Sequence, residues 1–553
     1  MERKWWKEQV IYQIYPRSFK DSNGDGIGDI NGIISKLDYL KLLGVDIIWL
    51  SPIYQSPNDD NGYDISDYYA IHPEFGTMEE FDMLLKGLHD RNMKLIMDIV
   101  INHSSDEHKW FEESRKSKVS PYRDYYFWRE GKDGGPPNNW QSFFGGSAWE
   151  LDKTTGEYYL HIFSKKQPDL NLENEKVRNE IFKILEFWLD KGVDGFRMDV
   201  VSLISKRLDF VDANQPTFGK VVEEVYSNGP RVHEYIKEMY DTVLSKYDIM
   251  TVGEGPGITT DVGLDYVGHD RGELNMIFHL DHMFLGFGPK GRFDQVPYNW
   301  NDVKNIFKDW YDAMGDSGWV SIFLDNHDFA RMVSRFGNDK LFRIESAKLL
   351  SMLVLTMRGT PCIFQGSEIG MTNVRAEDIS EYRDVETINF HKEFVTEGMS
   401  TFDFINIANI TGRDNARTPI QWNDSPNGGF CDADDEPWIG VNSNYESINV
   451  KQALSDRGSV FYFYKELLHL RKNAPALIYG NWEVIDQESD NLYVYKRYLE
   501  NEAYLVVLNH SDEHVAVDIE HIKAKILVIS NYDNRMTQVL LPWEARLYKL
   551  LNV

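Results

Sequence analysis

Eight short β-branched runs alternate with amphipathic stretches along most of the chain, and this alternation limits the possible folds more than any other feature. Such alternation predicts a parallel sheet covered by helices. Eight is also the number of strands that closes a (β/α)8 TIM barrel. An open doubly wound sheet is the alternative, but no Gly-rich dinucleotide turn follows the first run. The expected strands are Val10–Tyr15, Val45–Leu50, Lys94–Val100, Val193–Met198, Ile249–Gly253, Met276–Leu280, Val320–Leu324 and Pro361–Gln365. The clearest helical patterns are Ile33–Leu43, Phe81–Arg91, Arg178–Lys191, Val232–Ser245, Val303–Met314 and Glu345–Met357.

Two segments interrupt this α/β pattern. Residues 104–171 are rich in aromatic, Gly, Pro and Asn residues, and a structureless loop of that length is uncommon, so we expect a small inserted domain after the third strand. After a helix at Phe461–Lys472, short strands separated by turns predict an antiparallel all-β domain. The expected division is therefore barrel at 1–103 and 172–478, insertion at 104–171 and C-terminal domain at 479–553. The expected C-terminal strands are Trp482–Ile485, Leu492–Leu499, Ala503–Asn509, Val515–Ile519, Ile526–Ser530 and Ala545–Leu551.

Charge and composition exclude several classes of function. The chain has 59 Lys and Arg against 88 Asp and Glu, a formal charge of −29, which disfavours binding to nucleic acid. The N-terminus has no apolar h-region, and the densest apolar stretch, Leu349–Met357, is too short to span a bilayer. The two cysteines, Cys362 and Cys431, cannot form a disulfide framework. We expect reduced thiols and a cytoplasmic protein without membrane or nucleic-acid partners.

Acidic, basic and histidine side chains follow several of the predicted strands. In a barrel of this kind the active site lies at the C-terminal ends of the strands. Residues that follow separate strands are therefore expected to meet at one rim. These residues are Asp98–His103 after the third strand, Arg197 and Asp199 at the fourth, Glu254 at the fifth, and His327 and Asp328 at the seventh.

A pair of carboxyl groups on neighbouring strands suits the cleavage of a glycosidic bond, in which one carboxyl protonates the leaving oxygen and the other attacks the anomeric carbon. Asp199 and Glu254 are such a pair, and their closeness predicts retention through a covalent intermediate. Arg197 lies two residues before Asp199 and so faces the same side of the strand. We expect Arg197 to keep Asp199 ionised, and the charge of Asp199 to raise the pKa of Glu254.

Three further polar side chains complete this predicted site. Asp328 supplies a third carboxylate that can grip sugar hydroxyls and stabilise positive charge at the anomeric centre. His103 and His327 are expected to donate hydrogen bonds to hydroxyls.

These sequence blocks resemble the motifs of glycoside hydrolase family 13, the α-amylase family, and the resemblance covers essentially the whole chain. The subgroup that is most similar contains oligo-1,6-glucosidases and related α-glucosidases. The resemblance implies Asp199 as nucleophile, Glu254 as general acid/base and Asp328 as transition-state stabiliser, with no cofactor for catalysis. It also implies a barrel domain A, an inserted domain B and a β-sandwich domain C. The family blocks are Asp98–His103, Gln167–Asn171, Gly195–Val200, Gly253–Gly255 and Phe323–Asp328, and the subgroup marks are Trp5–Lys7, Gly412–Pro419 and Gln421-Trp422.

The resemblance also implies how a sugar is held. Tyr63 is expected to stack under the terminal glucose, with Asp64 binding its far hydroxyls and Phe144 beside it. An ion pair between Asp64 and Arg413 would close the non-reducing side. A closed pocket predicts exo-action on short oligosaccharides.

Linkage preference depends on residues around the aglycone. In the resembling subgroup the residue after the nucleophile tends to be Val in enzymes that favour α-1,6 links, and this chain has Val200. Two positions depart from the subgroup. Gly255 stands where a bulkier residue is usual, which predicts more room beside the acid, and Phe329 stands where a polar residue is usual.

An acidic loop follows the first strand. Acids and an amide alternate with Gly in a spacing typical of calcium loops, although position twelve is Gly32 and not Glu. Similar loops in the family hold Ca²⁺. The predicted ligands of a structural Ca²⁺ are Asp21, Asn23, Asp25, the Ile27 carbonyl and Asp29.

Two alternatives remain beside an α-glucosidase. A sucrose-acting glucosidase, sucrose isomerase or α-glucosyltransferase would share every catalytic residue. Isomerases of the family carry an Arg-rich segment after strand six, and the corresponding stretch Gly291–Gln295 keeps one Arg and the Asp, which argues against isomerisation. A non-catalytic binding subunit would lack the catalytic set and carry a membrane span. We expect a monomer or weak homodimer.

Overall fold

The structure is a computed structural model. It describes residues 3–215, 217, 219–486, 489–519, 525–533 and 537–551. Within these residues no helix is long and apolar enough to cross a membrane.

The predicted barrel is confirmed. Its strands form one eight-stranded parallel sheet in the order β11-β10-β9-β5-β2-β1-β15-β14. A parallel bridge between Ile277 and Val320 joins the two outer strands and closes the cylinder. The strands are β1 (Ile11–Ile14), β2 (Ile47–Leu50), β5 (Lys94–Ile99), β9 (Gly195–Met198), β10 (Met250–Gly255), β11 (Met276–His279), β14 (Ser321–Ile322) and β15 (Thr360–Phe364).

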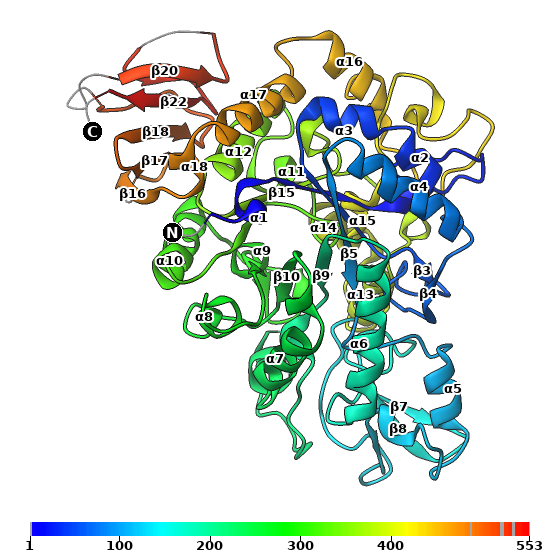
Figure 1. The fold of residues 1–553 in the computed structure, drawn as a ribbon. Helices are drawn as coiled ribbons and strands as arrows, with labels where there is room; N and C mark the ends of the chain where they lie inside the picture. The colour runs from blue at the N-terminus through cyan, green and yellow to red at the C-terminus, as the bar shows by residue number, and fades with distance from the viewer. Residues whose placement is uncertain are drawn as a thin grey trace.

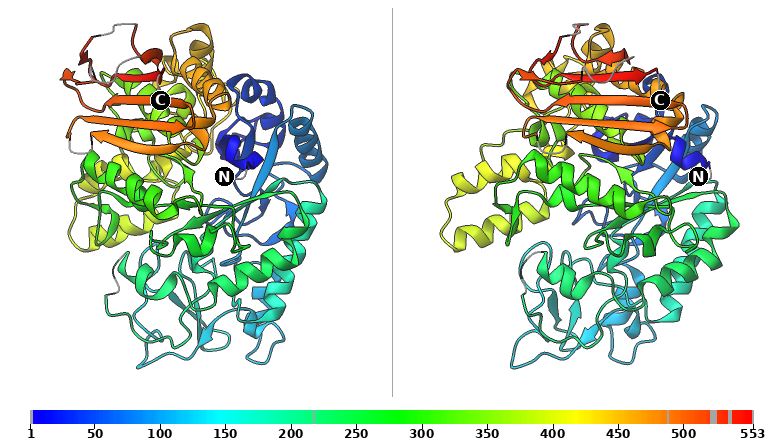
Figure 2. Two further views of the ribbon diagram at one scale, coloured as in Figure 1. Left: turned by 60° about the vertical axis from the view of Figure 1, so that its left-hand side comes forward. Right: turned by 90° about the vertical axis from the view of Figure 1, so that its left-hand side faces the viewer.

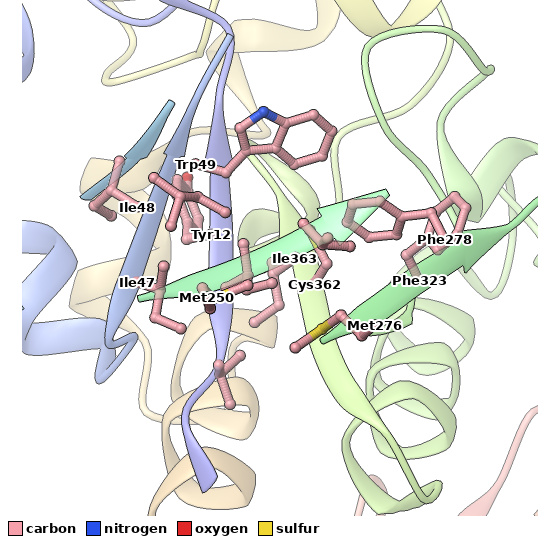
Figure 3. Close-up of a cluster of buried hydrophobic side chains, with 14 of the residues drawn as sticks. Tyr12, Ile47, Ile48, Trp49, Met250, Met276, Phe278, Phe323, Cys362 and Ile363 are labelled. Carbon is pink, nitrogen blue, oxygen red and sulfur yellow. The ribbon is translucent and has the colours of Figure 1, made fainter. Parts of the chain in front are cut away.

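The apolar sequence runs become strands because both of their faces are buried. Residues such as Ile47, Trp49, Met276 and Ile363 belong to one continuous core that fills the barrel and the layer beneath its helices. Figure 3 shows side chains of this core packed between the strands. Strands of a parallel sheet covered by helices are expected to read as unbroken hydrophobic runs and not as alternating patterns.

Helices surround the barrel (Figure 1). The predicted helix Ile33–Leu43 is two helices, because Asp29 caps the first at the Gly32 N–H and the chain bends at Lys36. The other predicted helices are confirmed with small shifts at their ends. The helices of this layer are α1 (Trp5–Glu8), α2 (Ile30–Ile34), α3 (Leu37–Leu43), α4 (Met78–His89), α6 (Glu175–Asp190), α7 (Val232–Thr242), α8 (Gly263–Val267), α9 (Asp281–Phe284), α10 (Trp300–Met314), α11 (Met332–Phe336), α12 (Arg343–Thr356), α16 (Val450–Ser455), α17 (Val460–Lys472) and α18 (Pro475–Ile478).

The inserted segment after β5 has secondary structure of its own. It has the helix α5 (Lys109–Arg115) and a three-stranded antiparallel sheet in the order β6-β8-β7, formed by β6 (Trp128–Arg129), β7 (Trp149–Asp152) and β8 (Glu157–Leu160). Trp140 and Trp149 belong to a second hydrophobic cluster, which they share with Phe210 and Tyr226 from the chain after β9. Other aromatic residues of the segment, such as Trp110 and Trp128, belong to the main core.

The C-terminal strands form a five-stranded antiparallel sheet in the order β16-β17-β18-β22-β20, with the pair β19-β21 as a second sheet. Leu492, Leu505, Val517 and Leu540 belong to one apolar cluster between them. Figure 1 shows this sheet at the opposite end of the molecule from the inserted segment. The strands are β16 (Asn481–Asp486), β17 (Leu492–Leu499), β18 (Glu502–Asn509), β19 (Val515–Ala516), β20 (Lys525–Ser530), β21 (Val539–Leu540) and β22 (Ala545–Leu550).

No helix was predicted for the segment between β15 and α17. Here α13 (Val385–Thr396) and α14 (Thr401–Thr411) form a hairpin, followed by the short α15 (Asp414–Arg417). Figure 2 shows the yellow hairpin projecting from the barrel. Asp384 caps α13 by accepting the N–H groups of Glu386 and Thr387. This hairpin supplies part of the site described next.

Candidate active site

A pocket opens where the predicted site residues meet at the C-terminal ends of the strands. Of the predicted set, eight residues line it: Tyr63, His103, Phe144, Asp199, Val200, Glu254, Asp328 and Arg413. Arg197 and His327 lie directly behind this lining and are buried. The predicted arrangement of polar groups at one rim of the barrel is therefore present.

One guanidinium joins three carboxyl groups at the floor of the pocket. Arg197 Nη1 donates to Asp199 Oδ1 at 2.6 Å and to Asp98 Oδ1 at 2.8 Å. Arg197 Nη2 lies 2.8 Å from Glu254 Oε2. Because one planar group contacts both Asp199 and Glu254, the two carboxyls are close neighbours.

Three buried carboxyls cannot all be ionised against one positive charge without a large cost. Burial, followed by the charges of Glu254 and Asp98, raises the pKa of Asp199, although Arg197 opposes the shift. Burial also raises the pKa of Glu254, with further contributions from Asp328 and Asp98. We predicted that Arg197 would keep Asp199 ionised and that the charge of Asp199 would raise the pKa of Glu254. Arg197 does pair with Asp199, but it is shared with Asp98 and Glu254, and burial raises the pKa of Asp199 against it. The pKa of Glu254 is raised as predicted, but burial is the largest cause.

Val200 has a strained backbone beside these carboxyls. Its φ is 35°, in the left-handed region that a β-branched residue rarely adopts. In this conformation its N–H donates to Glu254 Oε2 at 3.2 Å. Glu254 Oε2 thus accepts from Arg197 and Val200, which leaves Oε1 free to carry a proton.

Asp328 is held as an anion by a group of positive side chains. Its Oδ1 accepts from Arg413 at 3.2 Å and from Arg417 at 2.9 Å. Burial opposes ionisation, but the approach of His327 and the positive charges of Arg413 and Arg417 hold the pKa of Asp328 well below its ordinary value.

Both predicted histidines are neutral. Burial lowers the pKa of His327 to about 3 and that of His103 to about 3. Gln13 Nε2 donates to His327 Nδ1 at 2.8 Å, so the neutral ring carries its proton on Nε2, which faces Asp328 Oδ2 at 3.2 Å. His327 Nε2 can therefore donate a hydrogen bond, and its donation to a sugar hydroxyl stays a prediction.

Tyr63 is fixed on one side of the pocket. Its ring stacks on His327 with centroids 5.1 Å apart and 6° between the planes. Its hydroxyl donates to Asp98 Oδ2 at 2.9 Å. The rigid ring leaves a flat surface on which a sugar can stack.

The prediction of an ion pair between Asp64 and Arg413 is wrong. Arg413 Nη2 contacts Asp60 Oδ1 at 3.1 Å and Asp384 Oδ1 at 2.6 Å. The Asp64 carboxylate instead accepts the backbone N–H groups of Asp59 and Asp60 and has no exposed surface. Asp64 therefore shapes the loop, and Asp60 is the acid that lines the pocket.

Other residues of the pocket were missed by sequence reasoning. They are Asp60, Phe143, Phe163, Pro256, Leu280, Phe284, Arg292 and Glu386. Asp60 lies two residues before Gly62-Tyr63-Asp64, so its closeness to Tyr63 was the available signal. Glu386 lies on α13, a helix for which we had no prediction, and only the fold brings it to the pocket.

The two departures around the aglycone have different outcomes. The predicted extra room at Gly255 is absent, because a Cβ there would lie 2.7 Å from Ile258 Cδ1. Phe329 does line the pocket, and its ring stacks on Phe287 with centroids 6.3 Å apart. The guanidinium of Arg292 lies 5.3 Å from the Phe329 ring. The aglycone side is thus more apolar than a polar residue at 329 would make it.

The acidic loop after β1 is tightly folded by its own side chains. Asp21 accepts the N–H groups of Asn23, Gly24 and Gly26, and Asp25 accepts the N–H of Ile27. Asp29 caps α2 and accepts from Ser22. The predicted ligand atoms are all oxygens, the type that Ca²⁺ prefers, but within the described residues the carboxylates of Asp25 and Asp29 do not lie close enough to that of Asp21 to form a group that could share one ion. In the described part of the chain, the carboxyl and thiol groups close enough to share an ion are those of Asp21, Cys431 and Asp435. Both cysteines are free and buried.

Comparison with known proteins decides the family. The model of the α-amylase catalytic domain matches residues 13–480, and that of the cyclo-malto-dextrinase C-terminal domain matches residues 489–548. The chain belongs to glycoside hydrolase family 13, the α-amylase family. As a member it is a glycoside hydrolase, and the chemistry of this family is carried by carboxyl groups of the protein.

Individual members of the α-amylase family match over the whole length. An oligo-1,6-glucosidase of Parageobacillus thermoglucosidasius is 55% identical over 562 residues, covering 100% of both chains. A trehalose-6-phosphate hydrolase of Bacillus subtilis is 45% identical, covering 99% of this chain and 98% of its own. The crystal structure of an isomaltulose synthase from Klebsiella matches with a TM-score of 0.96 and 45% identity, covering 99% of this chain and 100% of that one.

Proposed function

We propose that this α-amylase family member is a retaining, exo-acting α-glucosidase. It releases α-glucose from the non-reducing end of short α-glucosides and prefers α-1,6 links such as that of isomaltose. The observation that carries the proposal is a pocket in which Asp199 and Glu254 share Arg197 while Arg413, bound to Asp60 and Asp384, lines the same pocket. We infer that the ion pairs of Arg413 close the end that receives the non-reducing sugar. A closed end admits only a chain terminus, which supports exo-action.

The proposed mechanism has two displacements. Asp199 attacks the anomeric carbon while Glu254 gives its proton to the glycosidic oxygen, so that the C–O bond breaks and a glucosyl ester forms on Asp199. Glu254 then takes a proton from water, whose oxygen attacks the same carbon and releases α-glucose and free Asp199. Carboxyls about 5 Å apart are typical of retention and separations of about 6.5–9.5 Å of inversion, and a shared guanidinium favours the shorter separation. Asp328, ionised between Arg413 and Arg417, is suited to stabilise the positive charge of the transition state.

The remaining site residues have proposed roles in holding the sugar. Tyr63 offers a stacking surface, and Phe144 covers Arg413, whose guanidinium lies 4.7 Å from its ring. His327 is suited to donate to a hydroxyl from Nε2. His103 lines the pocket, but its two ring nitrogens face the side-chain amides of Asn102 and Gln167, so its donation to a hydroxyl stays a prediction. Asp60 takes the role predicted for Asp64.

Val200 is the proposed determinant of linkage, and product analysis tests both it and the function. Wild-type protein is expected to release glucose from isomaltose at least about tenfold faster than from maltose. Thr is β-branched like Val, so Val200→Thr keeps the shape of the side chain on the strained backbone. The substitution exchanges one methyl group for a hydroxyl. We expect it to lower the isomaltose-to-maltose ratio of kcat/KM by about three- to tenfold, since one methyl contributes about 1 kcal/mol of discrimination.

Chromatography of products from isomaltose, maltose, trehalose and sucrose separates the candidate functions. Glucose from isomaltose supports the proposal, and its release as the α-anomer, followed by proton NMR, supports retention. Rearrangement of sucrose would favour the alternative of an isomerase, to which the likeness to isomaltulose synthase gives some support. Slow cleavage of isomaltose beside fast cleavage of maltose would contradict the role of Val200.

We also propose that the loop after β1 binds a structural Ca²⁺ through Asp21, Asn23, Asp25, the Ile27 carbonyl and Asp29. An ion that binds only the folded state at 100 times its Kd stabilises by about 2.7 kcal/mol. Treatment with EDTA is therefore expected to lower the Tm by several degrees, and excess Ca²⁺ to restore it. Asp25→Ala should have the lower Tm with or without Ca²⁺. Equal melting curves of wild-type protein in EDTA and in Ca²⁺ would refute the site.

The division into domain A (1–103 and 172–478), domain B (104–171) and domain C (479–553) is likewise a proposal. It is supported by the separate three-stranded sheet of the insertion and by the apolar cluster between the C-terminal sheets. A cytoplasmic location and a monomer or weak homodimer stay predictions.

A further inference from the structure

A second hollow of about 410 Å³ lies beside the catalytic pocket. It is bounded by the 141–146 loop of the inserted segment, by α13, by Thr217, Val221 and Val222, and by the turn at 289–290. Phe143 lines both hollows. The described mechanism uses none of the other residues of this outer hollow.

One wall of the outer hollow continues a wall of the catalytic pocket along α13. Glu386 lines the catalytic pocket, whereas Phe390, Glu393 and Glu397 line the outer hollow. These four positions are spaced by four, three and four residues, so they form one stripe on a single helix face. From Glu386 to Glu397 the stripe rises about 16 Å along the helix axis. That is several times the length of a single bond in a sugar ring.

The opposite wall runs outward in the same direction. Phe144 lines the catalytic pocket, Phe143 lines both hollows, and Ser142 and Gln141 line the outer one. The loop turns back at Gly145, where a Cβ would lie 3.2 Å from Glu393 Oε2 across the hollow. Two independent segments thus lead from the catalytic carboxyls to the same outer space.

The outer hollow offers the groups that bind sugars. Phe143 and Phe390 give apolar surface, on which the faces of sugar rings pack. Within the described part of the chain, the Gln141 amide and the Glu393 carboxylate have no hydrogen-bond or ion-pair partner. Lys290 and Glu397 pair at 2.5 Å on the rim. Unpaired amide and carboxylate groups can accept and donate to hydroxyls without breaking an existing contact.

We propose that the outer hollow binds the third and following sugar units of a gluco-oligosaccharide whose terminal glucose lies in the catalytic pocket. The inference rests on the proposed α-glucosidase function and extends it from disaccharides to longer chains. Gln141 and Glu393 bind hydroxyls of the third unit, and Phe143 separates it from the bond that is cleaved.

The test compares chain lengths in two linkage series. We would measure kcat/KM for isomaltose, isomaltotriose, maltose, maltotriose and nitrophenyl α-glucoside. The wild-type protein is expected to gain about five- to tenfold in kcat/KM on addition of the third unit, from two hydrogen bonds of ordinary strength. The double variant Gln141→Ala/Glu393→Ala should lose this gain. Its kcat/KM for disaccharides and for the nitrophenyl substrate should stay within twofold of wild type.

Two more variants make the result specific. Glu393→Trp fills the hollow and should lose the same gain, whereas Lys392→Ala removes an exposed neighbour on α13 and should keep it. Equal kcat/KM of the wild-type protein for two- and three-unit substrates in both series would overturn the inference. So does a gain that survives in both Glu393 variants. Cleavage of the maltose series alone would contradict the linkage proposal but leave the length test intact, and cleavage of neither series would contradict the proposed function and this inference together.

Discussion

Replacement of Asp199 by Ala is expected to lower kcat for every α-glucoside by at least about 10⁴-fold, because no other carboxyl can form the glucosyl ester. Asp98 also contacts Arg197, but it is fully buried behind Tyr63 and does not line the pocket. The loss should be equal for isomaltose and for a nitrophenyl glucoside, because both need the same nucleophile.

The fold of Asp199→Ala should be intact. Asp98 and Glu254 still balance the charge of Arg197, and the removed carboxyl is one whose pKa burial raises. We therefore expect a Tm no lower than that of wild type, measured by calorimetry beside the kinetics. Asp261→Ala, which removes one exposed carboxyl far from the pocket, is the matched control and should keep full activity. Substantial glucosidase activity in folded Asp199→Ala would show that the proposed mechanism is wrong.

The barrel and the gathering of its polar residues could be predicted because each depends on local sequence. Buried parallel strands are short apolar runs in the sequence. Their C-terminal ends lie at one rim of the barrel, whatever the conformation of the connecting loops. The closeness of Asp199 and Glu254 could therefore be predicted once β9 and β10 were assigned correctly. Arg197 was likewise expected on the same face as Asp199, because strand side chains alternate.

The contacts of Arg413 could not be predicted in the same way. Its partners Asp60 and Asp384 come from a loop after β2 and from the start of α13, far apart in the chain. Asp60 and Asp64 lie four residues apart in one loop. Which of them pairs with Arg413 depends on which carboxylate accepts hydrogen bonds from the backbone of the loop. The two N–H groups that bind Asp64 decide it.

Gly255 illustrates a related limit. A missing side chain predicts space only if no neighbour fills it, and here Ile258 occupies that space from three residues away. The shared role of Arg197 is similar. Sequence spacing predicted its contact with Asp199, but the contact with Glu254 and the burial of all three carboxyls depend on the closed barrel.

Glu254→Gln is expected to separate the two chemical steps. The variant cannot give a proton to the glycosidic oxygen, so kcat/KM for isomaltose, whose leaving group is a poor one, should fall by about 10³-fold. A dinitrophenyl α-glucoside has a leaving group that needs no proton and should still transfer its glucosyl group to Asp199. Release from Asp199 then lacks its base, so a burst of dinitrophenol followed by slow turnover should be seen in stopped-flow absorbance.

The pH dependence of kcat/KM in wild type and in Glu254→Gln tests the role of Glu254 independently. Burial raises the pKa of Glu254 above its ordinary value, so the acid form that the first step requires persists to a higher pH than a free Glu would allow. Wild-type kcat/KM for isomaltose should therefore fall as pH rises through this raised pKa. Glu254→Gln has no such group, so the alkaline limb should disappear from its residual activity on isomaltose.

Added azide gives the outcome that would contradict the assignment. Azide needs no general base, so it should restore turnover of the dinitrophenyl substrate in Glu254→Gln and produce α-glucosyl azide, the anomer formed when a second displacement follows attack by Asp199. A β-glucosyl azide would mean a single displacement and a carboxyl pair acting by inversion. An unchanged alkaline limb together with no azide rescue would mean that another group is the acid. Because Glu254 Oε2 already accepts from Arg197 and Val200, the proton that these experiments follow is the one on Oε1.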